Sequence, residues 1–176
     1  MRAVAIALVI LLLSLNMVVF DVSFYKNNSN CEDNCGNVIK YFVFLDDLEG
    51  DYSEEELIHM KDVRKLILIN IFLLITLIGL LIVFVGQRDF LHGGIGALSA
   101  TLLVLILGLI NFSGAFVAFH KIFFWNDFWL LPSDSLLITM FPQEFFYGAM
   151  IRIILYSIIL SVVSIIGGLI KWKRKK

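Results

Sequence analysis

Four long runs of uncharged, mostly apolar residues constrain the fold of this chain more than any other feature. They cover residues 3–20, 66–86, 93–119 and 153–170. A helix needs about 20 such residues to cross a hydrocarbon layer of about 30 Å, and a longer run crosses it with tilt. We therefore predict an all-α integral membrane protein with four transmembrane helices, forming a single membrane domain over residues 1–176.

Composition supports a membrane protein and argues against two other classes. Hydrophobic residues make up 60% of the chain, whereas a soluble domain usually has about 45–50%. A nucleic-acid partner would need a basic face on a folded surface. The chain has only a basic C-terminal cluster, KWKRKK, which we interpret as a cytoplasmic stop after the last span. We therefore predict no nucleic-acid partner.

The first apolar run has two interpretations. Behind the single Arg2 it is at the short end of what spans a bilayer, and it could be a cleaved signal peptide. No A-x-A-like cleavage site follows it, because the next residues are Asp21, Val22, Ser23 and Phe24. We therefore favour an uncleaved membrane anchor.

The orientation of the spans follows from the density of positive charge. Four spans place both termini on one side, and each side then carries seven Lys and Arg residues. On the side of the termini these residues lie in short segments next to the spans, where positive charge determines orientation. We predict cytoplasmic termini, an inner turn at 87–92, and two outer segments at 21–65 and 120–152.

The first outer segment is acidic and contains both cysteines. It holds eleven of the fifteen carboxylates, together with Cys31 and Cys35. An oxidising compartment would permit a disulfide between them. Two cysteines with no nearby His fall short of a four-ligand zinc set, so we favour a small disulfide loop or two free thiols. Residues 38–45, VIKYFVFL, predict a short strand or a piece lying at the membrane interface.

A helix is predicted from Ser53 into the second span. Ser53 is a good N-cap, and three glutamates follow it in the first turn. Glu56, His59 and Asp62 lie at i, i+3 and i+6, so they share roughly one face. His59 therefore has a carboxylate within reach on either side, at the predicted level of the outer headgroups.

The second outer segment is aromatic, acidic and interrupted by proline. Phe and Trp side chains at this density are typical of the headgroup level of a bilayer. Pro132 and Pro142 prevent a single long helix. We predict a re-entrant or interfacial element whose ordered polar side chains face inwards.

Two histidines are candidates for proton transfer. His120 stands at the outer end of the third span, at the predicted depth of His59, whereas His92 is in the inner turn. Two imidazoles flanking one bond can act as an acid and a base near neutral pH. The simpler alternative is that His59 is a solvated helix residue and His120 an interfacial cap.

Other polar and aromatic residues also have two interpretations. Arg152 can extend its side chain to the interface, pair with Asp127, Asp134 or Glu144, or hold a lipid oxygen. Most aromatic residues are expected in packing and in the interfacial belt, while Trp129 can also line a substrate pocket. The sequence contains no nucleophile motif, P-loop, dinucleotide fingerprint or H-E-x-x-H motif.

Two segments, EEELIHMKDVRKL and FHKIFFWNDFWLLPSDSLLITMFPQEFF, resemble the family of small membrane proteins that includes the bacterial lipoprotein intramolecular transacylase. The family pattern has four spans and two motifs. The matching positions here are Glu56, His59, Asp62, Val63, Phe119, His120, Phe123, Phe124, Trp129, Pro132, Asp134, Pro142 and Phe146. The Cys31/Cys35 loop departs from this pattern, and residues 21–52 align loosely.

The resemblance implies acyl transfer within a diacylated lipoprotein, with the active site at the outer leaflet of the cytoplasmic membrane. The α-amino group of the lipid-modified Cys would attack the sn-2 ester and give an N-acyl lyso product. His120 is expected as base and His59 as acid, held by Asp62 or Glu56. The expected substrate-binding residues are Trp129, Asp134, Asp127, Arg152, Phe123 and Phe124. Neither a cofactor nor a metal is expected, and a monomer is a plausible state.

Two other functions compete with this prediction. A non-enzymatic four-span scaffold would bind a partner through the acidic outer loop and would tolerate replacement of both histidines. A metal-dependent membrane hydrolase would use His59, His120 and the carboxylates, and would be sensitive to chelators.

Overall fold

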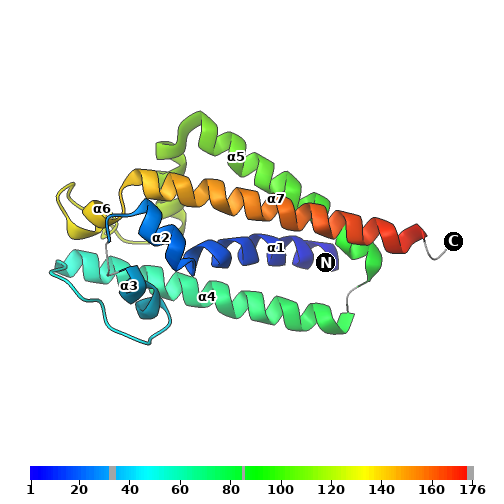
Figure 1. Ribbon diagram of the computed structural model, residues 1–176, viewed down its shortest axis with the longest axis horizontal. Helices are drawn as coiled ribbons and strands as arrows, with labels where there is room; N and C mark the ends of the chain where they lie inside the picture. Colours follow the sequence, from blue (N-terminus) through cyan, green and yellow to red (C-terminus); the bar gives the residue numbers. More distant parts are fainter. Residues whose placement is uncertain (32–34, 85, 174–176) are drawn as a thin grey trace. The chain divides into compact units, whose positions relative to one another are not determined.

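The computed structural model describes residues 1–31, 35–84 and 86–173, and it is helical with intervening turns (Figure 1). Residues 32–34 of the cysteine loop and 174–176 of the basic tail lie outside the described residues. The helices are α1 (Arg2–Val19), α2 (Val22–Asn28), α3 (Cys35–Phe42), α4 (Glu54–Phe84), α5 (Gln87–Phe123), α6 (Leu136–Met140) and α7 (Gln143–Lys173).

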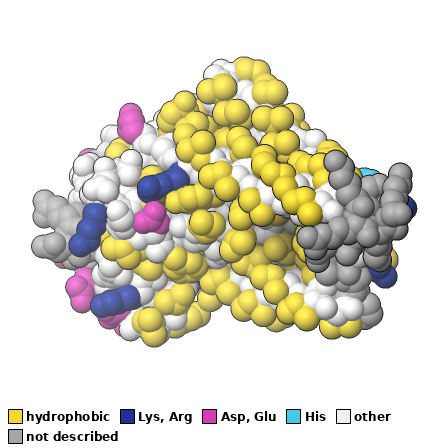
Figure 2. Space-filling view, turned by 45° about the vertical axis from the view of Figure 1, so that its right-hand side comes forward, with side chains coloured by type: hydrophobic (Ala, Val, Ile, Leu, Met, Phe, Trp, Pro, Cys, Tyr) yellow, Lys and Arg dark blue, Asp and Glu magenta, His cyan; other side chains and the backbone are white. Residues whose placement is uncertain are grey.

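Four of these helices are long and apolar enough to cross a membrane. They are α1, α4, α5 and α7, and their apolar windows have mean hydropathies of 2.4 to 3.1. Hydrophobic side chains cover most of the face shown in Figure 2, as expected where helices contact lipid. The prediction of an all-α membrane protein with four spans is confirmed.

The described chain forms two compact units. The first comprises Met1–Val18, Asn70–Ile110 and Ile151–Lys176, and the second comprises Val19–Ile69 and Asn111–Met150. All four long helices contribute to both units, α1 only through Val19. The prediction of a single membrane domain stays a prediction.

Small residues bring the helices of the first unit into close contact. A Cβ atom at Gly93 of α5 would lie 2.8 Å from the carbonyl oxygen of Ala3 in α1, and one at Gly94 would lie 2.8 Å from that of Ser161 in α7. Lipid provides little hydrophobic driving force between helices, so close packing of backbones has to hold them. The core beside these contacts consists of Ile6, Ile10 and Ala97, packed against Ala7, Leu81 and Leu160.

Two hydrogen bonds between side chains link helices of the first unit. Thr101 Oγ1 and Ser157 Oγ lie 2.6 Å apart, which links α5 to α7. The side chains of Asn16 and Asn70 are hydrogen-bonded, which links α1 to α4. Bonds of this kind add roughly 0.6 kcal/mol each in a membrane protein, so they supplement the packing at the glycines.

An aromatic cluster forms the core of the second unit. Phe24 and Tyr25 of α2 contact Phe145 of α7, with ring centroids 5.1 and 5.2 Å apart. Tyr25 also contacts Phe141, which follows α6, at 5.9 Å. Burial raises the pKa of the Tyr25 hydroxyl above its usual range. These contacts bring the beginning of the first predicted outer segment against the second.

The region around the cysteines is helical, and the strand alternative for residues 38–45 is wrong. Val38, Tyr41 and Phe42 are buried at helical spacing on α3. Cys31 and Cys35 form a disulfide with a Cα–Cα distance of 5.2 Å. Only one face of the short helix α3 is thus packed. The β-branched and aromatic residues of this segment are also common in strands, so the sequence alone does not reveal the helix.

The third predicted span is interrupted near its end. Asn111 of α5 has φ −157° and ψ 85°, which are not helical values. Its Oδ1 accepts a hydrogen bond of 2.9 Å from the N–H of Gly114, so its side chain caps the helical segment that follows. Residues 93–119 were predicted as one continuous span. A single capping Asn within an apolar run explains the difference.

Replacing Gly94 with Ala tests the packing of α5 on α7. The new methyl would meet the Ser161 carbonyl oxygen at 2.8 Å and the Ile165 nitrogen at 3.0 Å, and these backbone atoms cannot move without separating the helices. We expect Gly94→Ala to lower the free energy of unfolding by about 1–3 kcal/mol. Gly79→Ala is the control, because nothing lies within 4 Å of its added Cβ. Equal effects on unfolding in detergent would contradict the assignment.

Candidate active site

The two candidate histidines lie close together in the second unit. His59 is in the second turn of α4, and His120 is in the last turn of α5. Their ring centroids are 6.0 Å apart and their planes differ by 31°. His120 is buried, with 8% of its surface exposed, and His59 is half-buried. The rings meet as predicted, and their catalytic roles stay a prediction.

Aromatic rings surround the imidazole pair. The ring of Phe124 lies 5.1 Å from His59 and 5.5 Å from His120, measured between centroids. Trp129 and Phe116 lie against His120 at 5.0 and 4.3 Å. Packed rings exclude water, which strengthens the electrostatic interactions of any charge that forms between the imidazoles.

The ring nitrogens of the two histidines have different partners. His120 Nδ1 lies 2.8 Å from the carbonyl oxygen of Phe116. A carbonyl can only accept, so Nδ1 carries the proton and the neutral ring has its lone pair on Nε2. His59 Nδ1 is buried and has no hydrogen-bond partner among the described residues. The tautomer of His120 is therefore fixed by its own helix, whereas no described hydrogen bond to Nδ1 fixes that of His59.

Asp62 connects α4 to the turn that follows α5. Its Oδ2 accepts a hydrogen bond of 2.8 Å from Asn126 Nδ2, and Asn126 Oδ1 accepts one of 3.1 Å from the N–H of Phe128. The turn bearing Trp129 is thus tied to the helix bearing His59. Asp62 lies one turn from His59 on the same helix, as its spacing predicted.

Glu56 has a different environment from the predicted one. Its side chain is 2% exposed, and its Oε2 accepts a 2.7 Å bond from the N–H of Ser53. Ser53 Oγ accepts a 3.2 Å bond from the N–H of Glu56 in return. This reciprocal pair is a capping box. The N-cap predicted at Ser53 is confirmed.

The second oxygen of Glu56 holds α6. Oε1 accepts a 2.7 Å hydrogen bond from the N–H of Leu137. Asn30 bonds the other end of α6, because its N–H and its Nδ2 donate to the carbonyls of Met140 and Thr139. Tyr52 also contacts Met140 through its hydroxyl, and burial, followed by the charge of Glu56, raises the Tyr52 pKa. Both described bonds of the Glu56 carboxylate are to backbone, which indicates a positioning role.

An open hollow of about 440 Å³ lies beside the histidines. Phe124 and Trp129, which contact the imidazoles, form part of its wall. Its lining residues are Lys121, Ile122, Phe124, Trp125, Asn126, Asp127 and Trp129. The hollow therefore combines apolar walls with a cation, an amide and a carboxylate.

The remaining predicted substrate-binding residues are Asp134, Phe123 and Arg152. Asp134 is exposed. Phe123 is 48% exposed and packs on Phe119 with ring centroids 4.8 Å apart. Arg152 belongs to the first unit. The substrate-binding roles proposed for these three residues stay predictions.

Sequence reasoning did not include Asn126, Lys121 and Trp125 among the site residues. Asn126 lies in an aromatic turn, and nothing in the local sequence indicates its hydrogen bond to Asp62, which is 64 residues earlier in the chain. The exposure of Trp125, at 99%, could have been suspected because Asn126 and Asp127 follow it directly. The carbonyl partner of His120 could have been found, since residue i−4 is the usual acceptor for a polar side chain in a helix.

The described residues contain no group of three or more His, Cys, Asp or Glu side chains that could hold a metal ion. Protein zinc sites use three or four such ligands. The metal-dependent hydrolase alternative therefore lacks a ligand set in this part of the chain.

Comparison with known families identifies the chain. The family model of the lipoprotein intramolecular transacylase Lit matches residues 1–146. The chain belongs to this family. It is therefore an enzyme of the membrane, and the resemblance inferred from the two sequence motifs is confirmed.

Solved structures support the fold of this Lit family member. The membrane-integral lipoprotein intramolecular transacylase Lit from Bacillus cereus has a TM-score of 0.86 and 24% identity, covering 99% of this chain and 95% of the other. Two variants of that protein, with one histidine replaced by arginine or by alanine, have TM-scores of 0.72 at 24% identity. They cover 99% of this chain and 91% or 93% of theirs. A search of curated proteins gave no match.

Replacing Glu56 tests its positioning role. Glu56→Ala would remove the acceptor of the Ser53 N–H and would leave the N–H of Leu137 without its acceptor in a buried place. We expect the free energy of unfolding to fall by about 3 kcal/mol. Glu55→Ala is the matched control, because Glu55 is exposed in the same helical turn and should cost no more than about 1 kcal/mol. Equal losses in detergent would rule out the role.

Proposed function

We propose that this transacylase moves the sn-2 acyl chain of a diacylglyceryl-modified N-terminal Cys onto the α-amino group of the same Cys. The product is an N-acyl lipoprotein with a lyso-glyceryl group. The observation that carries the proposal is the pair of imidazoles with centroids 6.0 Å apart. A proton must leave the amine and another must reach the glyceryl oxygen, and two adjacent imidazoles can exchange both.

His120 acts as the base in this proposal. Its Nδ1 donates to the Phe116 carbonyl, so Nε2 of the neutral ring can accept a proton from the α-ammonium group, whose pKa is usually about 8. The free amine then attacks the ester carbonyl. The hydrogen bond to Phe116 stabilises the imidazolium that forms, because the carbonyl dipole faces the protonated ring.

His59 acts as the acid. The C–N bond forms as the C–O bond of the sn-2 ester breaks, and the leaving glyceryl oxygen takes a proton from His59. The proton first taken from the ammonium group passes to water, and His120 accepts the second proton that the nitrogen loses as the amide forms and returns it to His59. Two protons therefore leave the nitrogen, of which one reaches water and one the glyceryl oxygen.

The nucleophile and the ester belong to one molecule, so positioning supplies much of the rate. Intramolecular reactions with good geometry reach effective molarities of about 10⁵ M and above. We assign the hollow lined by Phe124, Asp127 and Trp129 to the glyceryl group and the first residues of the lipoprotein. Neither a covalent enzyme intermediate nor a cofactor is needed in this scheme.

The proposed location is the outer leaflet of the cytoplasmic membrane. The density of Lys and Arg next to the spans supports cytoplasmic termini, which would place the segments bearing His59 and His120 outside. The proposed partners are a diacylated lipoprotein and the surrounding lipid, and a monomer suffices because both histidines come from one chain.

Replacing either histidine tests the acid/base roles. We expect His120→Ala and His59→Ala to reduce the rate of lyso product formation by about 10²–10⁴-fold. The measurement is mass spectrometry of the N-terminal lipopeptide from a co-expressed lipoprotein. His92→Ala is the control, because His92 is exposed and bonds only its own helix among the described residues.

The same variants distinguish the enzyme from a scaffold. A scaffold would tolerate both replacements with no loss beyond stability, so the unfolding midpoint of each variant must be measured beside its activity. N-acyl lyso product at the wild-type level in a folded His120→Ala protein would overturn the proposed mechanism.

Removal of metal tests the hydrolase alternative. The described residues hold no three-ligand cluster, so incubation of the purified enzyme with EDTA or phenanthroline should leave its rate unchanged within about twofold. Loss of activity that is restored by added Zn²⁺ would favour the metal-dependent mechanism.

A further inference from the structure

The helix α3 ends in a common C-terminal motif, but Phe44 occupies a position of that motif where glycine is usual. The N–H of Leu45 bonds the carbonyl of Lys40 at 3.0 Å, and the N–H of Phe44 bonds that of Tyr41 at 3.2 Å. This pair of bonds is a Schellman motif. Its left-handed position is normally glycine, but here it is Phe44, with φ 58°. A bulky side chain in this conformation is strained, so its ring must contribute something that glycine could not.

The Phe44 ring lies on an arginine. The guanidinium carbon of Arg64 in α4 is 4.2 Å from the centroid of Phe44 and 4.2 Å from that of Tyr41. No hydrogen bond or ion pair of Arg64 occurs among the described residues. The two rings fix the guanidinium plane while its five N–H groups stay available.

The position of Arg64 along α4 gives the depth of this cluster. The second apolar run begins at Leu66, two residues after Arg64, which is a rise of about 3 Å along a helix. The Phe44 ring therefore lies at the edge of the hydrocarbon layer. Phe44 and its neighbour Leu45 are 64% and 76% exposed, so two apolar side chains face outwards at this level.

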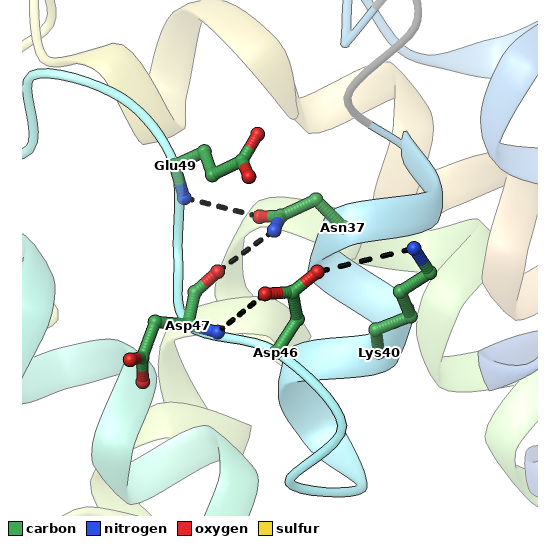
Figure 3. A network of polar contacts seen from close by, with 5 residues as sticks. All are labelled: Asn37, Lys40, Asp46, Asp47 and Glu49. Carbon is green, nitrogen blue, oxygen red and sulfur yellow. Dashed lines mark hydrogen bonds and ion pairs between the residues drawn. The ribbon is translucent and has the colours of Figure 1, made fainter.

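The acidic loop that follows is held in place against α3 (Figure 3). Asn37 donates to the carbonyl of Asp47 at 2.7 Å and accepts from the N–H of Glu49 at 3.1 Å. Lys40 and Asp46 form an ion pair at 3.9 Å. The exposed apolar pair is thus a fixed feature between a helix and an anchored loop.

We propose that Phe44 and Leu45 form a lipid-contacting tip, inserted among the phospholipids around α4, with Arg64 bound to a lipid phosphate. An apolar pair at the interfacial level and a planar cation with free donors match the two parts of a phospholipid. The tip holds the α3 region at the bilayer surface. This surface is separate from the imidazole pair, and the proposal does not depend on the transacylase chemistry.

Spin labelling of the full-length protein tests the tip. With the native disulfide closed, Leu45→Cys provides one reactive thiol for a nitroxide in vesicles of phosphatidylethanolamine and phosphatidylglycerol. We expect its relaxation by oxygen to exceed that by a water-soluble nickel complex several-fold. Asp51→Cys is the control, because Asp51 is exposed in the acidic loop and should show the opposite order. Equal nickel accessibility at the two positions would overturn the proposal.

Two further variants separate lipid contact from a structural role. Phe44→Gly relieves the left-handed strain, so we expect an unchanged or higher unfolding midpoint in detergent together with nickel accessibility at position 45 raised several-fold. Arg64→Gln removes the charge and should raise the same accessibility at an unchanged overall helicity. Unaltered accessibility in Phe44→Gly would show that the ring does not hold the tip, and in Arg64→Gln that the phosphate contact is absent.

Discussion

A single buried carboxylate sets the geometry of the second unit. Glu56 receives an N–H from Ser53, before α4, and another from Leu137, in α6. Two backbone N–H groups thus bond its carboxylate, and charged acceptors make such bonds stronger than neutral ones. His59 follows one turn later on the same helix. The direction of α4 and the place of α6 are therefore fixed together, close to the imidazole of His59.

Two other contacts complete this arrangement, and both come from the segment that follows α5. Asn126 bonds Asp62, and Phe124 packs on both imidazoles. The described hydrogen bonds of Asp62 and Glu56, the carboxylates predicted to assist His59, hold neighbouring segments in place. Catalytic groups perform best when neighbouring residues hold their orientation, and in this site backbone amides and an asparagine provide that support.

The sequence predicted the features that depend on local patterns. The four spans follow from hydropathy alone, and Ser53 with Glu56 carries the signature of a capping box. The proximity of His59 and His120, whose ring centroids are 6.0 Å apart, agrees with their positions next to the ends of the apolar runs. The helical form of α3, the Asn126–Asp62 bond and the acceptor at Leu137 depend on contacts between distant segments. No periodicity within 38–45 distinguishes a strand from a short helix packed on one face.

The break at Asn111 shows why a span prediction cannot give the direction of a catalytic residue. One residue outside helical φ/ψ separates residues 112–123 from the preceding helix, and Asn111 caps the new segment. Ser113 then accepts a bond of 2.7 Å from Gln143 at the start of α7. The segment that ends in His120 is thus oriented by contacts within the second unit. A continuous span would instead have tied the imidazole to the register of an apolar helix, whose packing is selected for stability and not for chemistry.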